Sequence, residues 1–269
     1  MKNQLKLKTK GEWVSRYLKG VSILWLFLLG GCSQLQSNIP DPTVESPLIM
    51  KPMGSIGLSL GTRPGHSYIF TSDASRRPPN LTSPEIESSS FLYAGGSYSF
   101  TDRFQLGVEI FPLNAGMEPN FKWQVLGDGV SGAQLSFNGA LGFFYSSKTG
   151  DQNGTFGSGG HNWKGSAQGG TARFGFSLGY FLRENFLPYF GAAAGTLKTD
   201  ATIDHDLSSD GGSPAASYKE SDTGRVLSVG GGVQVGTSTP VNVGATYSDI
   251  KYDRAGRHFK TQWSVSFSF

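Results

Sequence analysis

The sequence predicts an all-β protein: a closed antiparallel up-and-down transmembrane β-barrel of ten strands. Three observations favour this fold. After residue 52, apolar and polar residues alternate with a period of two, and no window keeps a helical period. Hydrophobic residues make up only 37% of the chain, yet it holds 38 glycines and 13% aromatic residues. Such a mixture suits a wall whose alternate residues face lipid and lumen.

The net charge of +3 originates in the N-terminal residues. Residues 1–31 hold six basic side chains and one acidic side chain, whereas the rest of the chain holds 17 basic and 19 acidic residues. Because the body of the protein is slightly acidic, we expect no nucleic-acid partner. The single cysteine, Cys32, excludes a disulfide framework.

The N-terminus has the order of a secretory signal. A basic stretch, residues 1–20, precedes the apolar run 21–29. This run is too short for a transmembrane helix, which needs about 20 apolar residues. An ordinary signal peptide and a true start downstream of Met1 are the alternatives that this segment leaves open.

The end of the signal, Leu29-Gly30-Gly31-Cys32, resembles the bacterial lipobox. The resemblance implies that lipoprotein-processing enzymes cleave before Cys32 and attach lipid to its thiol. The following Ser33 implies delivery to the outer membrane. Residues 33–52 contain four prolines among polar residues, which predicts a tether without regular structure.

We therefore expect three parts: a signal peptide over 1–31, a lipidated N-terminus and flexible tether over 32–52, and a barrel over 53–269. The clearest strand is 134–145, where six apolar or small residues alternate with small polar ones. The ten candidate strands are 53–62, 89–100, 103–113, 118–126, 133–147, 168–182, 186–197, 223–236, 241–252 and 259–269. Because 118–126 is the weakest, a barrel of eight strands is the main alternative.

The predicted connections alternate in length. Short connections lie near 101–102, 127–132, 183–185 and 237–240, and long ones near 63–88, 148–167 and 198–222. Short periplasmic turns and longer external loops are typical of membrane barrels. An even number of strands brings both chain ends to the periplasmic side, so we expect the lipid on Cys32 in the periplasmic leaflet.

We expect the apolar face of the strands to contact lipid. The other face holds mainly Gly, Ser, Asn and Gln, and only 16% of all residues are charged. A soluble barrel usually has an outer surface rich in Lys and Glu. A soluble lipocalin-like barrel, with the apolar face turned inward, is the alternative.

The C-terminus strengthens this interpretation. Trp263, Val265, Phe267 and Phe269 alternate with serine and resemble the signature read by the barrel assembly machinery. Residues 187–195, LPYFGAAAG, resemble a strand of small outer-membrane barrels. Residues 53–269 thus resemble the superfamily that includes outer membrane protein A and the opacity proteins. The resemblance implies a place in the Gram-negative cell envelope, with outer-membrane lipids and the assembly machinery as partners. This chain differs from the usual member of the superfamily, which has a plain signal peptide without a lipobox.

No catalytic constellation stands out. None of the four histidines is spaced as a metal site, and no cofactor motif is present. Asp204-His205-Asp206 invites comparison with omptin proteases, but the triplet falls in a predicted loop without a second acidic pair. A lipid-modifying barrel enzyme needs a His and a Ser on a late strand, which the stretch around His258 does not offer.

Three charged residues, Glu109, Lys122 and Arg173, fall on the face predicted to line the lumen. We interpret them as a polar network that holds the wall together, with a solute-selecting constriction as the alternative. The leading hypothesis for the whole protein is a structural or surface-interaction barrel with long external loops and an unknown external ligand. A narrow pore for small hydrophilic solutes is second, and an omptin-type or lipid-modifying enzyme is third.

Overall fold

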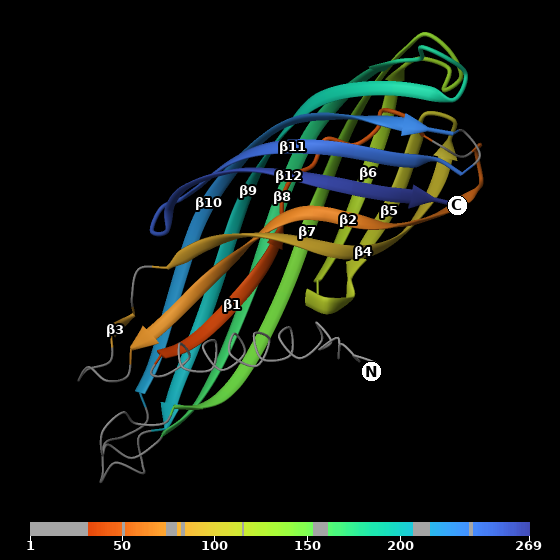
Figure 1. Cartoon of the computed structure of the whole chain (residues 1–269). Coiled ribbons are helices and arrows are strands. Elements are labelled where there is room, and N and C mark those ends of the chain that lie inside the picture. Colours follow the sequence, from red (N-terminus) through yellow and green to blue (C-terminus); the bar gives the residue numbers. More distant parts are fainter. Residues whose placement is uncertain are drawn as a thin grey trace, which may run out of the picture.

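The computed structural model describes residues 32–49, 52–73, 80–81, 84–114, 116–152, 161–206, 216–236 and 239–269 (Figure 1). The elements are β1 (Cys32–Pro40), β2 (Ile56–Asp73), β3 (Asn80–Leu81), β4 (Glu85–Thr101), β5 (Phe104–Phe111), a 3-10 turn η1 (Pro112–Asn114), β6 (Gly116–Leu126), β7 (Ala133–Gln152), β8 (His161–Tyr180), β9 (Phe186–Asp206), β10 (Ala216–Val235), β11 (Val241–Tyr252) and β12 (Gly256–Ser268). No helix in these ranges is long and apolar enough to span a membrane.

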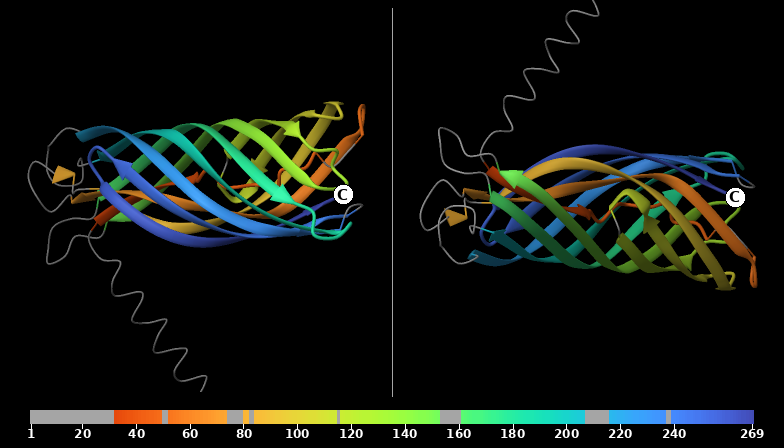
Figure 2. Two further views of the ribbon diagram at one scale, coloured as in Figure 1. Left: turned by 90° about the horizontal axis from the view of Figure 1, so that it is seen from above. Right: turned by 90° about the horizontal axis from the view of Figure 1, so that it is seen from below.

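Ten of the described strands close a ring. Strands β4 to β12 follow one another as antiparallel neighbours, and β2 pairs with both β4 and β12. The remaining two, β1 and the two-residue β3, pair only with β2. Figure 2 shows the strands tilted around the barrel axis. The predicted up-and-down barrel is confirmed, and each of the ten candidate strands has its counterpart in the ring.

The two ends of the barrel differ. Short connections at 102–103, 127–132, 181–185 and 236–240 lie at the same end as the C-terminus, where Phe269 pairs with Leu58. The 127–132 turn has three glycines at positive φ, a backbone region that L side chains rarely adopt. We call this the short-turn end and the other the long-loop end.

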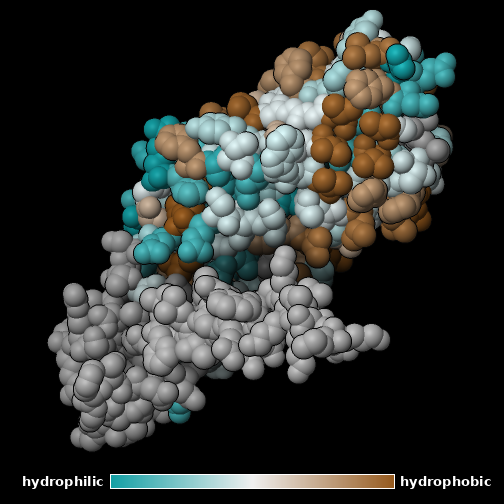
Figure 3. Space-filling view, in the orientation of Figure 1, coloured by the Kyte–Doolittle hydropathy of each residue, from teal (hydrophilic) through white to brown (hydrophobic). Residues whose placement is uncertain are grey.

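The outward face of each long strand changes character along its length. On β8, Phe174, Phe176 and Tyr180 point outward near the short-turn end, whereas the outward positions nearer the long-loop end are Asn162, Lys164, Ser166 and Gln168. Strands β9, β10 and β11 follow the same rule. Figure 3 shows the apolar side chains gathered toward the short-turn end. They form a belt, and the lipid-facing side predicted for the apolar residues is the outer face within it.

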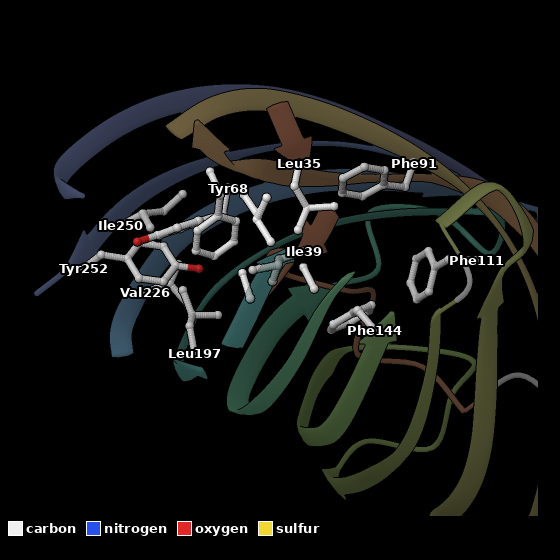
Figure 4. Close-up of a cluster of buried hydrophobic side chains, with 14 of the residues drawn as sticks. Leu35, Ile39, Tyr68, Phe91, Phe111, Phe144, Leu197, Val226, Ile250 and Tyr252 are labelled. Carbon is white, nitrogen blue, oxygen red and sulfur yellow. The ribbon is translucent and has the colours of Figure 1, made fainter. Parts of the chain in front are cut away.

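Inside the barrel the distribution is reversed. Nearer the long-loop end, where the outer face is polar, the lumen is filled by a buried apolar cluster (Figure 4). We call this part the polar half of the barrel. The cluster includes Leu35, Tyr68, Leu197, Val226 and Ile250. At the level of the belt, the side chains that point into the lumen are mainly polar, among them Ser136, Ser177 and Gln234. A membrane-spanning strand needs about 9–11 residues, and β8 has 20. The barrel therefore combines a part whose surface suits lipid with a part built like a water-soluble barrel.

This reversal explains one wrong prediction. The expected long loops at 63–88, 148–167 and 198–222 are largely strand, because β2 extends to Asp73, β7 to Gln152 and β9 to Asp206. In these extensions apolar residues alternate inward instead of outward, so the pattern that marks the belt is broken. The wall continues beyond the belt, and the segments between the extended strands, 74–84, 153–160 and 207–215, are shorter than the predicted loops.

Strand β2 turns inward in its second half, although it stays paired with β4 as far as Ile69. It pairs with β12 only over Ser59–Gly61, and β1 takes over that edge from Gly65 to Asp73. Residues 63–70 are buried. Where β2 turns inward, β12 meets β4 through side chains, with Gln262 Nε2 donating to the Ser89 carbonyl at 2.5 Å.

The predicted tether is also wrong. Residues 32–40 form β1, and residues 41–49 continue through the lumen with mostly buried side chains. Leu35 and Ile39 are 1% exposed, so these apolar residues serve as lumen contacts rather than as part of a solvated linker. We call residues 32–49 the inner segment.

We expect the outward face of β8 to tolerate charge above the belt and not within it. Phe176→Arg places a charge at the middle of the belt and should lower the free energy of unfolding by about 2–4 kcal/mol. Gln168→Arg, on the same strand and face but above the belt, should change it by less than about 0.5 kcal/mol. Urea unfolding in lipid vesicles measures both. Equal losses would contradict the belt boundary.

Candidate functional site

The candidate site is the lumen and the inner segment that fills it. From the long-loop end the segment descends to the short-turn end, where Leu48 packs against Phe181 and Leu187. The Ile49 amide donates to Gln124 Oε1 at 3.2 Å, and the Ser46 hydroxyl donates to Gln234. The segment is thus attached to the wall at both ends of the lumen.

A network of six charges lies inside the belt. Glu118 accepts from Arg173 Nη2 at 2.7 Å and also from Arg63. Arg63 bonds Glu109 as well, and its Nη2 reaches Glu45 at 2.9 Å. The network consists of Arg63, Lys122 and Arg173 with Glu45, Glu109 and Glu118. Its formal charges balance, as a buried ionic cluster requires.

The structure brings the three predicted lumen charges into this network. Arg173 bonds Glu118, Glu109 bonds Arg63, and Lys122 Nζ lies 3.3 Å from Glu45. Three further members were not predicted: Arg63 was placed in a loop, Glu45 in the tether, and Glu118 is the first residue of the weakest candidate strand. Continuing the alternation of strand 53–62 by one residue would have turned Arg63 inward.

A second polar cluster joins the inner segment to three wall strands nearer the long-loop end. Asp41 Oδ1 lies 2.6 Å from His66 Nδ1, and its Oδ2 lies 2.7 Å from Lys260 Nζ. His66 Nε2 contacts the Tyr252 hydroxyl at 2.9 Å. All four side chains are buried. Because the ammonium of Lys260 faces the Asp41 carboxylate, this ion pair holds the inner segment against the wall.

Little free volume is left in the lumen. A cavity of about 150 Å³ lies beside the inner segment and is lined by Glu45, Arg63, Glu109 and Lys122 among other residues. Ion pairs join these four lining residues. A cavity of this volume can hold several waters.

His205 and His258 lie in different surroundings. His205 is buried and packs edge-on against Tyr218, while its neighbour Asp204 is exposed on the other face of β9. Side chains on opposite faces of a strand cannot form a dyad. His258 Nε2 lies 3.3 Å from Ser88 Oγ, but within the described residues no carboxylate orients its ring. No group of three potential metal ligands occurs in the described part of the chain.

The targeting residues lie at opposite ends of the barrel. Cys32 is the Cα partner of Asp73 at the long-loop end, while Leu29, Gly30 and Gly31 fall outside the described residues. This register contradicts the expectation that Cys32 and the C-terminus lie on the same side, because β1 runs down the lumen from the end opposite the C-terminus. The C-terminal Trp263, Val265, Phe267 and Phe269 lie on β12 and its end, with the three aromatic rings exposed on the outer face.

We expect the charge network to be essential for the stability of the barrel. Glu118→Gln leaves Arg63 and Arg173 short of a buried carboxylate and should cost about 3–5 kcal/mol of unfolding free energy. Glu184→Gln, in the exposed 181–185 turn, should cost less than about 0.5 kcal/mol. Urea unfolding followed by heat-modifiable gel mobility compares them. A neutral Glu118→Gln would show that the network does not hold the wall.

No protein-family model matches the sequence, and no curated protein matches it. Among solved structures, the outer membrane protease OmpT from Escherichia coli is 8% identical, with a TM-score of 0.38 over 88% of this chain and 95% of that chain. The attachment invasion locus protein Ail of Yersinia pestis is 13% identical, with a TM-score of 0.26 over 81% and 99%. The N-terminal β-barrel domain of Pseudomonas aeruginosa OprF is 11% identical, with a TM-score of 0.25 over 81% and 100%.

These similarities assign no role to any residue of this chain. The class of barrel follows from the geometry of the chain itself. A ring of ten antiparallel strands encloses a polar, charge-balanced interior at the level of an apolar outer belt. Aromatic side chains such as Phe100, Tyr180 and Trp263 are exposed on that outer surface. The chain is an antiparallel up-and-down β-barrel with an apolar outer belt around a polar interior.

Proposed function

We propose that this protein is a self-plugged outer-membrane barrel with a structural or surface-interaction role. The observation that carries the proposal is the inner segment, which fills the lumen and is held by Glu45 in one charge network and Asp41 in the other. Both carboxylates face cations of the wall. The surface offered to a partner is then the polar half of the barrel and its connections.

The alternative of a narrow pore requires the inner segment to move. Moving it would leave Arg63, Arg173 and Lys260 without the carboxylates of the segment, and unpaired buried charges are costly. The contacts of Leu48 and Ile49 near the short-turn end oppose the same movement. A closed barrel is therefore the resting state that the contacts favour.

We expect the native protein to show no discrete current steps in a planar lipid bilayer. The double variant Asp41→Asn, Glu45→Gln weakens both attachments of the inner segment and should produce intermittent steps. The matched control is Glu184→Gln, Asp253→Asn, whose carboxylates lie in exposed connections. Stable steps from the native protein would favour the pore over the structural role.

We also propose that Cys32 is the lipid attachment site and that its acyl chains insert from the outer side. The lipobox ending at Cys32 supports lipidation, and the start of β1 at the long-loop end supports the side. With the short turns in the periplasm, the inner segment carries its first residues through the barrel to the cell surface.

A fatty-acid probe and a surface tag test this arrangement together. Cys32→Ser should abolish probe incorporation. An epitope tag inserted after Ser33 should bind antibody on intact cells, whereas a tag in the 127–132 turn should require permeabilised cells. Incorporation into the Ser variant would exclude Cys32 as the attachment site. A tag at residue 33 detected only after permeabilisation would return the anchor to the periplasmic leaflet.

A further inference from the structure

A row of basic residues crosses four neighbouring strands on the outer face. Arg225 of β10 is the Cα partner of Lys251 of β11, and Lys251 is the partner of Arg257 of β12. Lys198 of β9 extends the row, because its partner Thr223 lies two residues from Arg225 on the same face. We call Lys198, Arg225, Lys251 and Arg257 the basic row.

The basic row sits directly above the apolar belt. Leu227 and Phe259 are 55% and 50% exposed and follow Arg225 and Arg257 by two residues on the same outward faces. The Arg257 guanidinium lies 4.6 Å from the centre of the Phe259 ring, which stacks on Tyr247. Aromatic rings of this kind mark the boundary between the hydrocarbon and the headgroups. At the long-loop side of the belt, the cations lie at the depth of lipid phosphates.

The row carries more positive charge than its surroundings balance. Arg257 donates to both oxygens of Asp249, at 2.6 and 2.8 Å, and Lys198 Nζ lies 3.3 Å from Asp200. Arg225 and Lys251 form no ion pair with any residue of the described ranges. Like charges directly opposite each other destabilise an antiparallel sheet. A third carboxylate, Asp253, accepts from the Thr223 hydroxyl at 2.6 Å beside the row. Four cations around three carboxylates leave a net positive charge, and Arg225 and Lys251 are the cations of the row that remain available to an anion.

We propose that the basic row binds the phosphates of an outer-leaflet lipid whose headgroup carries two phosphate groups. Neighbouring strands lie about 4.8 Å apart, so four strands span about 14 Å, which is wide enough for two phosphates. Arginine binds phosphate through two parallel hydrogen bonds, and lysine adds a point charge. The acyl chains of the same lipid then lie against Leu227, Tyr247 and Phe259. This inference rests on the outer-membrane role proposed above, with the long-loop end facing outward, and depends neither on Cys32 nor on the inner segment.

Titration of the full-length protein in uncharged detergent tests the proposal, with diphosphorylated and monophosphorylated lipid A as the probes. The variant Arg225→Gln, Lys251→Gln should weaken binding of the diphosphorylated lipid by about tenfold or more. Binding should also weaken as ionic strength rises. The control Lys164→Gln, Lys219→Gln removes two exposed outward cations above the row and should leave the affinity unchanged. Heat-modifiable mobility verifies that every variant is folded.

Several outcomes would overturn the proposal. The first is unchanged affinity in the row variant, and the second is an equal loss in the control. Equal affinity for both lipids would remove the requirement for two phosphates. If inorganic phosphate displaces the lipid at equal concentration, the row is a site for free phosphate and not for a lipid headgroup.

Discussion

The structure depends on the pairing of charges between the inner segment and the inward face of the wall. Arg63 and Arg173 project into a lumen that is almost closed to water, where an unpaired guanidinium is costly. Glu118 and Glu109 of the wall supply part of the compensation. Glu45 of the inner segment supplies the rest and also reaches Lys122. The inner segment therefore belongs to the charge network of the lumen, and the network is complete only when the segment is in place.

The second constraint is the surrounding medium, which changes along the barrel axis. In lipid, apolar residues belong on the outer face, and inward residues need only satisfy one another. In water the preference is reversed. Strand β8 obeys both rules within 20 residues, with Phe176 pointing out in the belt and Trp163 pointing in above it. A single strand thus shows where the apolar belt ends, and the basic row lies at that boundary.

The period-two pattern predicted the ring because every strand passes through the belt, where Leu141 or Phe174 alternates with a small polar residue. It did not predict the strand extensions, since the alternation there changes sign and the glycines and serines resemble loop composition. The inner segment was missed for a different reason. Four prolines in residues 33–52 favour an extended chain without a sheet of its own, and only the lumen that surrounds them makes this chain ordered. Of the six charges in the network around Glu118, three were identified from strand alternation. Arg63 and Glu45 lay outside the assigned strands, and Glu118 is the first residue of candidate strand 118–126.

The path of β2 connects these observations. Once β2 turns into the lumen, its backbone loses β12 as a partner, and unpaired amide and carbonyl groups inside the barrel would be costly. β1 replaces that partner from Gly65 to Asp73. The inner segment therefore completes the hydrogen bonds of β2 in one half of the barrel and the charge network in the other. Both requirements fall on one continuous stretch of chain, so the inner segment completes the backbone and the charge pairing of the lumen together. The pairing of β1 with β2 also fixes the position of Cys32 at the long-loop end.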